Sequence, residues 1–491
     1  MNKPLLVYQA PVFTRSGYGD HARDILRSLF KMDKYDVKVV PTRWGNTPQN
    51  QIEPHSEFGQ KVFANVVTQV DRNPDIFMQM SVANEFEPKG NFNIGITAGV
   101  ETTIIPKDFI DGSNKMDLII VPSQFTKSIM VGTAYQEKNK ETGQVVNEFK
   151  ITKPVEVLFE GVNTEIYSNP TETLSELDKL ETDFNFLFVG HWLKGDVGQD
   201  RKDVGMVIKT FATVFKYLPK DKRPGLIMKT SSAGFSVMDR EAIREKIDGI
   251  LQPFGDDAPA VYLLHGDLSD NEMASLYHHP KVSAMVSFTK GEGYGRPLAE
   301  FATTGKPILV SNWSGHLDFL KSGAVLLEGE LKPVHESAAD QFCMKEAQWF
   351  SVNYSTAANK IYDGLINKDI FEISYLNSNS ANTYGPFVAR YAGALGNSLT
   401  VSIIDSNTTF SSWTVNGIGI SSYFTGAPGT SVQATAAGAS NDEIHIIVTD
   451  SGGLFTGTKN TVLETYPFVS KAFNSTDSLG NSNYYKNVIF N

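Results

Sequence analysis

The sequence of 491 residues contains a single cysteine, Cys343. One cysteine can form neither an intramolecular disulfide nor a cysteine-rich metal site, and so few cysteines suit a reducing compartment. The sequence also lacks any run of about 18 apolar residues, the length of a membrane-spanning helix, so we expect no membrane span. The strand-like residues 5–10 near the start do not form the longer apolar stretch of a signal peptide, which favours a cytoplasmic location.

Basic residues are fewer than acidic residues. The chain has 44 Lys and Arg residues against 55 Asp and Glu residues, which gives a formal net charge of −11. This charge disfavours sequence-independent attraction to nucleic acid, although it is compatible with a local basic groove. No His-Glu-x-x-His, cysteine-pair or Asp-x-Asp motif indicates a metal site, and no Ser-His-Asp arrangement stands out.

The remaining composition is that of an ordinary globular protein, with strand-like and helix-like runs in alternation. Hydrophobic residues make up 41% of the chain and charged residues 20%, and the length leaves room for about two to four domains. Strand-like runs lie at residues 5–10, 35–41, 76–81, 93–97, 118–122, 155–159, 184–190, 226–229 and 261–264. Helix-like runs lie at residues 20–31, 203–218, 238–251 and 268–278.

This alternation predicts parallel, doubly wound sheets that bind ligands at the carboxyl ends of their strands. A polar stretch at residues 168–183 interrupts the alternation, which then begins again. We therefore expect an α/β fold with two Rossmann-like domains, residues 1–168 and 184–368, that face each other across a cleft.

The most informative stretch is Glu292-Gly-Tyr-Gly-Arg-Pro-Leu-Ala-Glu300. It lies between an apolar run, residues 282–288, and a helix-like run that begins at Pro297. Gly293 and Gly295 allow the backbone to approach a ligand closely, and the free N–H groups of a helix start suit a phosphate. The stretch therefore predicts a nucleotide site in which two carboxylates hold sugar hydroxyls. A helix start that merely carries two glutamates is the alternative.

Over the wider windows 286–300 and 305–316, the sequence resembles the donor-site signature of retaining glycosyltransferases of family 4, which have the two-domain GT-B fold. The resemblance implies a hexosyltransferase that uses a nucleotide-sugar donor (UDP- or GDP-hexose), an unknown acceptor and no metal or other cofactor. It implies a catalytic Glu292 that faces the transferred sugar and a Glu300 that binds the ribose. Further donor contacts that it implies are Gly293, Tyr294, Gly295 and Arg296.

The segment Asp200-Arg-Lys-Asp203 resembles the basic pair of the same family. The resemblance assigns a catalytic, diphosphate-binding role to Lys202, with Arg201 beside it. Two cations stabilise the charge that builds on a leaving diphosphate. The chain departs from the family at His191, where the family usually has arginine, and Lys194 or Arg201 would compensate. A solvated basic turn is the alternative.

Other loops fit the family less specifically. Gly17 and Gly19 would bring backbone amides near the donor sugar or pyrophosphate, although an ordinary turn explains them equally well. Glu101 matches a position at which related enzymes place an acceptor-side catalytic residue, and an N-cap or surface carboxylate is its alternative. Lys229 ends one predicted strand and His316 follows another, and we leave both outside the predicted site.

From about residue 371 the composition shifts to few charges and many Ser, Thr, Asn and Gly residues. Strand-like runs at 399–404 and 443–449 predict a β-rich α+β module over residues 371–491. The segments that resemble a contractile-phage tail sheath protein are residues 391–402, 442–448, 453–465 and 482–488. This resemblance implies a phage-encoded fusion, sheath subunits as partners and the cytoplasm of an infected bacterium as the location.

The sequence leaves three functions open. The first is the glycosyltransferase, which intact Glu292, Glu300 and Lys202 favour. The second is a virion structural protein whose transferase-like half is inert or only binds glycans, and His191 favours such an impaired site. A return helix cut short within residues 349–365 favours it too. The third, a transferase that acts on hydroxymethylated DNA bases, is disfavoured by the acidic chain.

Overall fold

The computed structural model describes residues 3–232, 234–320, 324–362, 395, 398–405, 407–436, 438–472, 475–477 and 481–490. The chain divides into two compact units, Met1–Asp363 and Gly364–Asn491. The predicted module boundary at residue 371 lies outside the described residues. Every helix among the described residues is too short or too polar to span a lipid bilayer.

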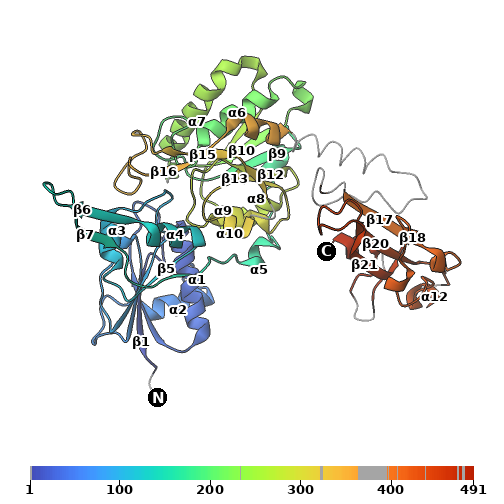
Figure 1. The fold of residues 1–491 in the computed structure, drawn as a ribbon, viewed down its shortest axis with the longest axis horizontal. Helices are drawn as coiled ribbons and strands as arrows, with labels where there is room; N and C mark the ends of the chain where they lie inside the picture. Colours follow the sequence, from blue (N-terminus) through green and yellow to red (C-terminus); the bar gives the residue numbers. More distant parts are fainter. Residues whose placement is uncertain are drawn as a thin grey trace. The chain divides into compact units, whose positions relative to one another are not determined.

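The first sheet of the first unit, at the blue end of the colour scale in Figure 1, consists of parallel strands in the order β2-β1-β3-β4-β5-β8. These strands are β1 (Leu5–Ala10), β2 (Asp36–Pro41), β3 (Ile76–Met80), β4 (Phe92–Ile96), β5 (Leu118–Val121) and β8 (Val155–Val157). β1 is apolar and buried along nearly its whole length, as expected of a parallel strand covered on both faces. The chain crosses from β2 to the other side of β1 to form β3, which creates a switch point there.

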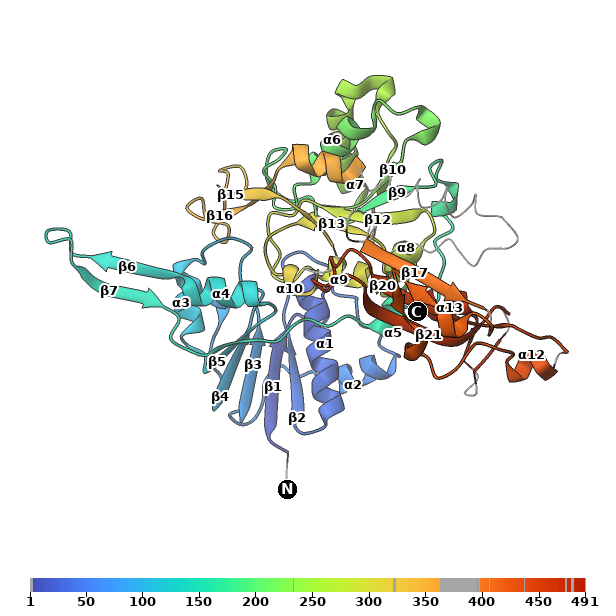
Figure 2. The same cartoon turned by 45° about the vertical axis from the view of Figure 1, so that its right-hand side comes forward.

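Helices cover both faces of this sheet. They are α1 (Gly17–Met32), α2 (Glu57–Asn65), α3 (Lys107–Ser113) and α4 (Gln124–Gly132). Successive strand residues point to opposite faces, so Tyr8 packs in one core cluster with Leu26 of α1, whereas Val7 packs in another with Phe77. A hairpin of β6 (Ala134–Lys138) and β7 (Val145–Lys150) projects from this domain (Figure 2).

The second sheet is also parallel and has the order β11-β10-β9-β12-β13-β14. Its strands are β9 (Asn185–Val189), β10 (Gly225–Lys229), β11 (Val261–Leu264), β12 (Val282–Ser287), β13 (Ile308–Ser311) and β14 (Val325–Leu327). This is the 3-2-1-4-5-6 order of a dinucleotide-binding Rossmann sheet, with its switch point between β9 and β12. A short helix, α5 (Thr164–Tyr167), lies in the connection between the two domains.

Helices flank the second sheet as well. They are α6 (Val204–Phe215), α7 (Val237–Leu251), α8 (Asp270–His278), α9 (Arg296–Ala302) and α10 (Leu317–Leu320). Figure 2 shows α6 and α7 on one face and α8 and α9 on the other. The alternation of β9 explains this, because Phe186 contacts Phe211 of α6 while Leu187 lies in the core cluster that contains Leu298 of α9.

The predicted fold class is confirmed: the first unit is α/β and carries the two Rossmann-like domains of the GT-B plan. One segment was wrong. Trp349, expected near the start of a return helix, lies in β16 (Gln348–Val352), which pairs with β15 (Gly329–Pro333). The aromatic and β-branched side chains of this run favour a strand, and Trp349 is buried in a small apolar cluster with Val334. The chain is helical only from residue 354 to 362, and residues 363–365 lie outside the described part.

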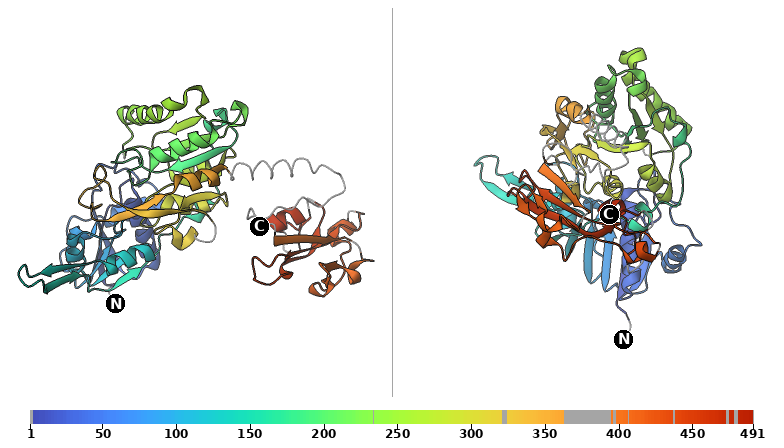
Figure 3. Two further views of the ribbon diagram at one scale, coloured as in Figure 1. Left: turned by 45° about the horizontal axis from the view of Figure 1, so that its top comes forward. Right: turned by 90° about the vertical axis from the view of Figure 1, so that its right-hand side faces the viewer.

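The second unit has an antiparallel sheet of β17 (Leu399–Ile404), β20 (Glu443–Asp450) and β21 (Thr461–Ser470), drawn in orange to red in Figure 3. Its other elements are β18 (Thr414–Val415), β19 (Ile418–Gly419), α12 (Val432–Ala436) and α13 (Tyr485–Phe490). The strands predicted at 399–404 and 443–449 are confirmed, and so is the β-rich α+β character. Of the sheath-like segments, residues 391–394 and 396–397 lie outside the described residues.

Candidate functional site

The candidate site lies at the switch point of the second sheet, where β9 and β12 pair side by side. The chain leaves β9 toward β10 on one side and later returns to form β12 on the other. The loops that follow these two strands, residues 190–203 and 288–295, therefore both open at the carboxyl end of the sheet, where α/β proteins bind ligands. The first loop carries the predicted Arg201 and Lys202, and the second carries Glu292.

The structure brings these three predicted residues together. Lys202 Nζ pairs with Glu292 Oε1, and Arg201 Nη1 lies 3.7 Å from Glu292 Oε2. The Glu292 side chain is 10% exposed. Burial alone would raise its pKa, but the charges of Lys202 and Arg201 lower the pKa of Glu292 to about 2. The carboxylate is therefore ionised at neutral pH and lies beside both cations in this state.

A buried ion pair that the sequence did not reveal lies beneath the site. Lys290 and Asp203 have fully buried side chains, and Lys290 Nζ lies 3.2 Å from Asp203 Oδ2. Tyr354 donates its hydroxyl to the same Asp203 oxygen at 2.7 Å, and the Lys290 N–H donates to the Arg201 carbonyl at 2.8 Å. These contacts join the two loops directly, so they fix the backbone that carries the two cations. A lysine next to the apolar strand β12 was the available signal.

A carboxylate of the first domain completes the charged group. Glu101, in the loop after β4, places Oε1 3.1 Å from Arg201 Nη1. The backbones approach closely here: a Cβ on Gly291 would overlap the Glu101 carbonyl, and one on Gly293 would lie 2.9 Å from the Ala98 carbonyl oxygen. Gly293 therefore allows the backbone of the other domain to approach closely, and its predicted approach to a ligand stays a prediction.

The Glu292 backbone is also held in place. Its N–H donates to the Ser314 hydroxyl at 2.9 Å, and its carbonyl accepts from the Gly315 N–H at 3.0 Å. Gly315 cannot be replaced freely, because a Cβ there would overlap the Gly293 carbonyl. The loop after β13 therefore orients the loop that carries Glu292.

Glu300 and Arg296 form a second charged group that also spans the two domains. Arg296 Nε lies 3.0 Å from Glu300 Oε1, and Tyr277 donates its hydroxyl to Glu300 Oε2 at 3.2 Å. Arg296 Nη1 lies 2.8 Å from Asp24 of α1 and 4.0 Å from Glu160. Burial raises the pKa of Glu300, and the charge of Arg296 opposes that change. Both Glu300 oxygens thus have protein partners in this state.

The sequence did not predict the residues around Arg296. Glu160 follows β8 and is surrounded by buried groups, and burial raises its pKa to about 7. His21 of α1 lies 3.7 Å from Glu160, and burial lowers its pKa to about 4. The available signal was the position of Glu160 just after a strand. Its pairing with α1 requires the tertiary fold.

The remaining predicted donor contacts are Gly17, Gly19 and Tyr294. Gly17 is exposed at the start of α1, with open space where a Cβ would stand. The Gly19 N–H donates to the Ser16 hydroxyl at 3.0 Å, so this amide serves the helix cap. The Tyr294 ring packs on Phe319 with 4.9 Å between ring centroids.

The other basic residues near the loops have separate partners. His191 Nδ1 lies 3.2 Å from the Ser231 hydroxyl. Lys194 donates to the carbonyl of residue 339 at 2.7 Å, and its predicted role in place of the family's arginine stays a prediction. Lys229 donates to the carbonyl of residue 266 at 2.6 Å, and the buried His316 places Nε2 2.8 Å from the carbonyl of residue 311.

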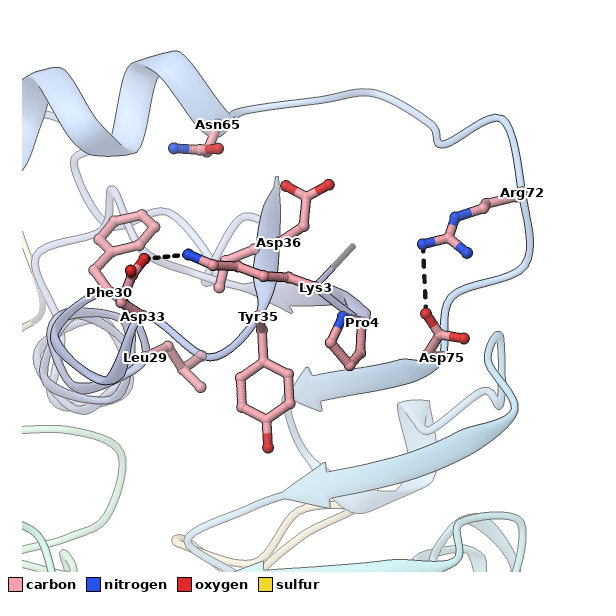
Figure 4. Close-up of a pocket in the computed structure, with 11 residues that line it drawn as sticks. Lys3, Pro4, Leu29, Phe30, Asp33, Tyr35, Asp36, Asn65, Arg72 and Asp75 are labelled. Carbon is pink, nitrogen blue, oxygen red and sulfur yellow. Dashed lines mark hydrogen bonds and ion pairs between the residues drawn. The ribbon is translucent and has the colours of Figure 1, made fainter. Parts of the chain in front are cut away.

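A separate hollow lies at the amino ends of β1 and β2 (Figure 4). Its polar lining includes Lys3, paired with Asp33 at 2.5 Å, and Arg72, paired with Asp75 at 3.4 Å. Because ligands of open α/β sheets bind at the carboxyl ends, this hollow does not belong to the candidate site. Among the described residues, no group of three or more His, Cys, Asp or Glu residues could hold a metal ion.

No protein-family model matches this sequence, and no curated protein matches it. Similar solved structures include sucrose-phosphate synthase from Thermosynechococcus elongatus, at 13% identity over 75% of this chain and 91% of that chain, with a TM-score of 0.46. Another is α,α-trehalose 6-phosphate synthase from Burkholderia multivorans, at 12% identity over 74% and 91%, with a TM-score of 0.46. A third, trehalose-6-phosphate from E. coli bound with UDP-2-fluoro glucose, shares 12% identity over 75% and 96%, with a TM-score of 0.45. We take no functional argument from these likenesses.

Proposed function

We propose that the first unit is a glycosyltransferase that takes a sugar from a nucleotide-sugar donor. The observation that carries the proposal is the meeting of Arg201, Lys202 and Glu292 at the switch point of a Rossmann sheet, opposite a loop of the other domain. A switch point is where such sheets bind nucleotides. Two cations on adjacent residues match the charge of a diphosphate, and a carboxylate beside them can accept hydrogen bonds from sugar hydroxyls.

Each residue has a distinct role in this proposal. Lys202 and Arg201 bind the donor diphosphate and stabilise the negative charge that grows on it as the glycosidic bond breaks. Glu292, which now pairs with Lys202, stands where the diphosphate's negative charge would lie. Once the donor displaces it from the lysine, Glu292 is free to hold the transferred sugar. Glu300 binds the ribose after exchanging its protein partners for the ribose hydroxyls.

We further propose that the sugar is a hexose, transferred with retention of configuration, and that no metal cofactor is needed. The bond between the anomeric carbon and the donor phosphate oxygen breaks. A bond from that carbon to the acceptor oxygen forms on the same face, and the acceptor proton passes to the leaving phosphate. The resemblance of residues 286–300 to retaining enzymes supports this stereochemistry. Activity that survives EDTA supports the metal-free site, and activity lost to EDTA and restored by a divalent cation contradicts it.

The second unit supports a second candidate function, that of a virion structural protein in which the first unit only binds glycans. This unit has apolar clusters of its own, one around Trp413 and Phe424 and one around Ile444 and Val469. A module with its own core is consistent with the proposed phage sheath-like fusion, which would act in the cytoplasm of an infected bacterium alongside sheath subunits.

Titration of the full chain with UDP-glucose, GDP-glucose and ADP-glucose separates the two candidates. Lys202→Ala should weaken binding of the preferred donor by about ten- to a hundredfold, since it removes a charged hydrogen bond worth ~1.5–3 kcal/mol. Lys194→Ala is the matched control, because Lys194 lies in the same loop and donates to the carbonyl of residue 339. A folded chain that binds no donor contradicts the transferase and leaves the structural protein.

A further inference from the structure

One guanidinium in the candidate site is shared between the two domains. Arg201 Nη1 lies 3.1 Å from Glu101 of the first domain, 3.7 Å from Glu292 of the second and 3.0 Å from the Gly291 carbonyl. The side chains of Arg201 and Glu101 are 22% and 26% exposed, so the pair is partly open to solvent. Lys202, by contrast, pairs with a carboxylate of its own domain.

We propose that Glu101 is a positioning residue that holds Arg201 from across the domain interface and competes with the donor diphosphate for that guanidinium. The inference rests on the proposed function, because it takes the diphosphate as the incoming anion. It assigns Glu101 a role in donor affinity, whereas the sequence predicted a catalytic role on the acceptor side. The carboxylate of Glu101 pairs with Arg201 while no donor is bound, and this ion pair breaks when the donor binds.

Charge balance supports this exchange. In the present state two carboxylates, Glu101 and Glu292, neutralise two cations, Arg201 and Lys202. A diphosphate that joins this group adds negative charge, so its binding is favoured only if it replaces carboxylate contacts rather than adding to them. Arginine suits such an exchange because its planar fork of donors fits carboxylates and phosphates alike.

Backbone packing confines the exchange to side chains. The Gly291 Cα lies so close to the Glu101 carbonyl that no Cβ fits between them. The backbone of Thr103, in the same loop, donates to the Gln348 carbonyl at 2.8 Å, and the Gln348 N–H donates to the Thr103 hydroxyl at 2.9 Å. The Glu101 backbone is therefore held on both sides, and the carboxylate can leave Arg201 without separating the domains.

The inference predicts a gain in nucleotide affinity when the competing charge is removed. Glu101→Gln keeps the size of the side chain and removes its charge, so UDP or GDP should bind about two- to fivefold more tightly, the range of a partly exposed ion pair. In an Arg201→Met background the same substitution should change the dissociation constant by less than about twofold, because the contested cation is gone. A residue that only joins the domains would lower thermal stability and leave nucleotide affinity unchanged.

The test is calorimetric titration of the full chain and its variants with UDP and with GDP. Asp267→Asn is the matched control, because Asp267 also forms an ion pair across the two domains but with Arg15. Tighter nucleotide binding by Glu101→Gln, without tighter binding by Asp267→Asn, supports the inference. Unchanged or weaker binding in Glu101→Gln, or equal tightening in Asp267→Asn, overturns the inference and leaves the proposed function standing. Absence of nucleotide binding by both the unaltered chain and Glu101→Gln overturns the proposed function and the inference with it.

Discussion

The buried pair of Lys290 and Asp203 offers the sharpest test of how the site is supported. Both side chains are fully buried, and Asp203 Oδ1 has no hydrogen-bond partner among the described residues. Among the residues that the structure describes, Lys290 is the cation paired with Asp203, so Lys290→Met leaves Tyr354 as a side-chain partner of that carboxylate. Loss of one partner of a buried ion pair typically costs ~3–5 kcal/mol, so we expect a fall of that order in the free energy of unfolding.

The size of this loss should depend on pH. Burial raises the pKa of Asp203, and Lys290 and the Tyr354 hydroxyl oppose that shift, so Lys290→Met removes the charge that opposes it and leaves the Tyr354 hydrogen bond. A carboxyl with a raised pKa in the folded state contributes stability that is present below its unfolded pKa and is lost as the pH rises through its folded pKa. The cost of Lys290→Met should therefore be smaller at acid pH and larger at pH 8.

Urea unfolding at pH 5 and pH 8, followed by tryptophan fluorescence, measures both effects. Trp349 lies close to the pair, with 6.0 Å between its ring centroid and Lys290 Nζ. Lys194→Met is the matched control, because it removes an exposed lysine. The double variant Lys290→Met/Asp203→Asn should be more stable than Lys290→Met alone, since no uncompensated charge stays buried. A Lys290→Met variant within about 0.5 kcal/mol of the unaltered chain refutes the reasoning.

Three other predictions concern Glu292, Gly291 and the metal independence of the proposed reaction. The pKa of Glu292 is lowered to about 2 from 4.5, so its contribution to the free energy of unfolding should be present above its unfolded pKa and lost as the pH falls from about 4.5 to 2. Glu292→Gln should therefore flatten that part of the curve of stability against pH. Gly291→Ala should reduce donor affinity and thermal stability together, because its Cβ overlaps the Glu101 carbonyl, whereas Gly17→Ala, which has open space, should change stability little. EDTA should leave transfer activity unchanged, as assayed by release of UDP or GDP.

Much of the fold followed from local patterns in the sequence. Runs of apolar residues separated by helix-like segments predicted the strands of the first sheet and most of those of the second, because a buried parallel strand is apolar on both faces, but β14 was missed. β16 was missed because Gln348–Val352 is short and its pairing with β15 is a tertiary feature. We assigned the residues of this strand to the same helix as residues 354–362, which are helical in the structure.

The site was predicted only in part, for a related reason. Glu292, Arg201 and Lys202 lie in motifs of local sequence, and the structure brings them together. The ion pairs that join distant segments were missed: Lys290 with Asp203 beneath these residues, and Arg296 with Asp24 in the second charged group. Such pairs follow from the topology of the sheets and from the contact between domains, which spacing along the chain does not encode.

A crystal structure of the full chain with its preferred nucleotide would show whether the donor binds at the switch point of the second sheet. We expect a diphosphate within hydrogen-bonding distance of Lys202 and Arg201, with Glu292 and Glu101 both released from these cations. A nucleotide bound elsewhere, for instance in the hollow beside Lys3 and Arg72, would contradict this expectation. So would a diphosphate at the switch point that leaves the pairing of Lys202 with Glu292 intact.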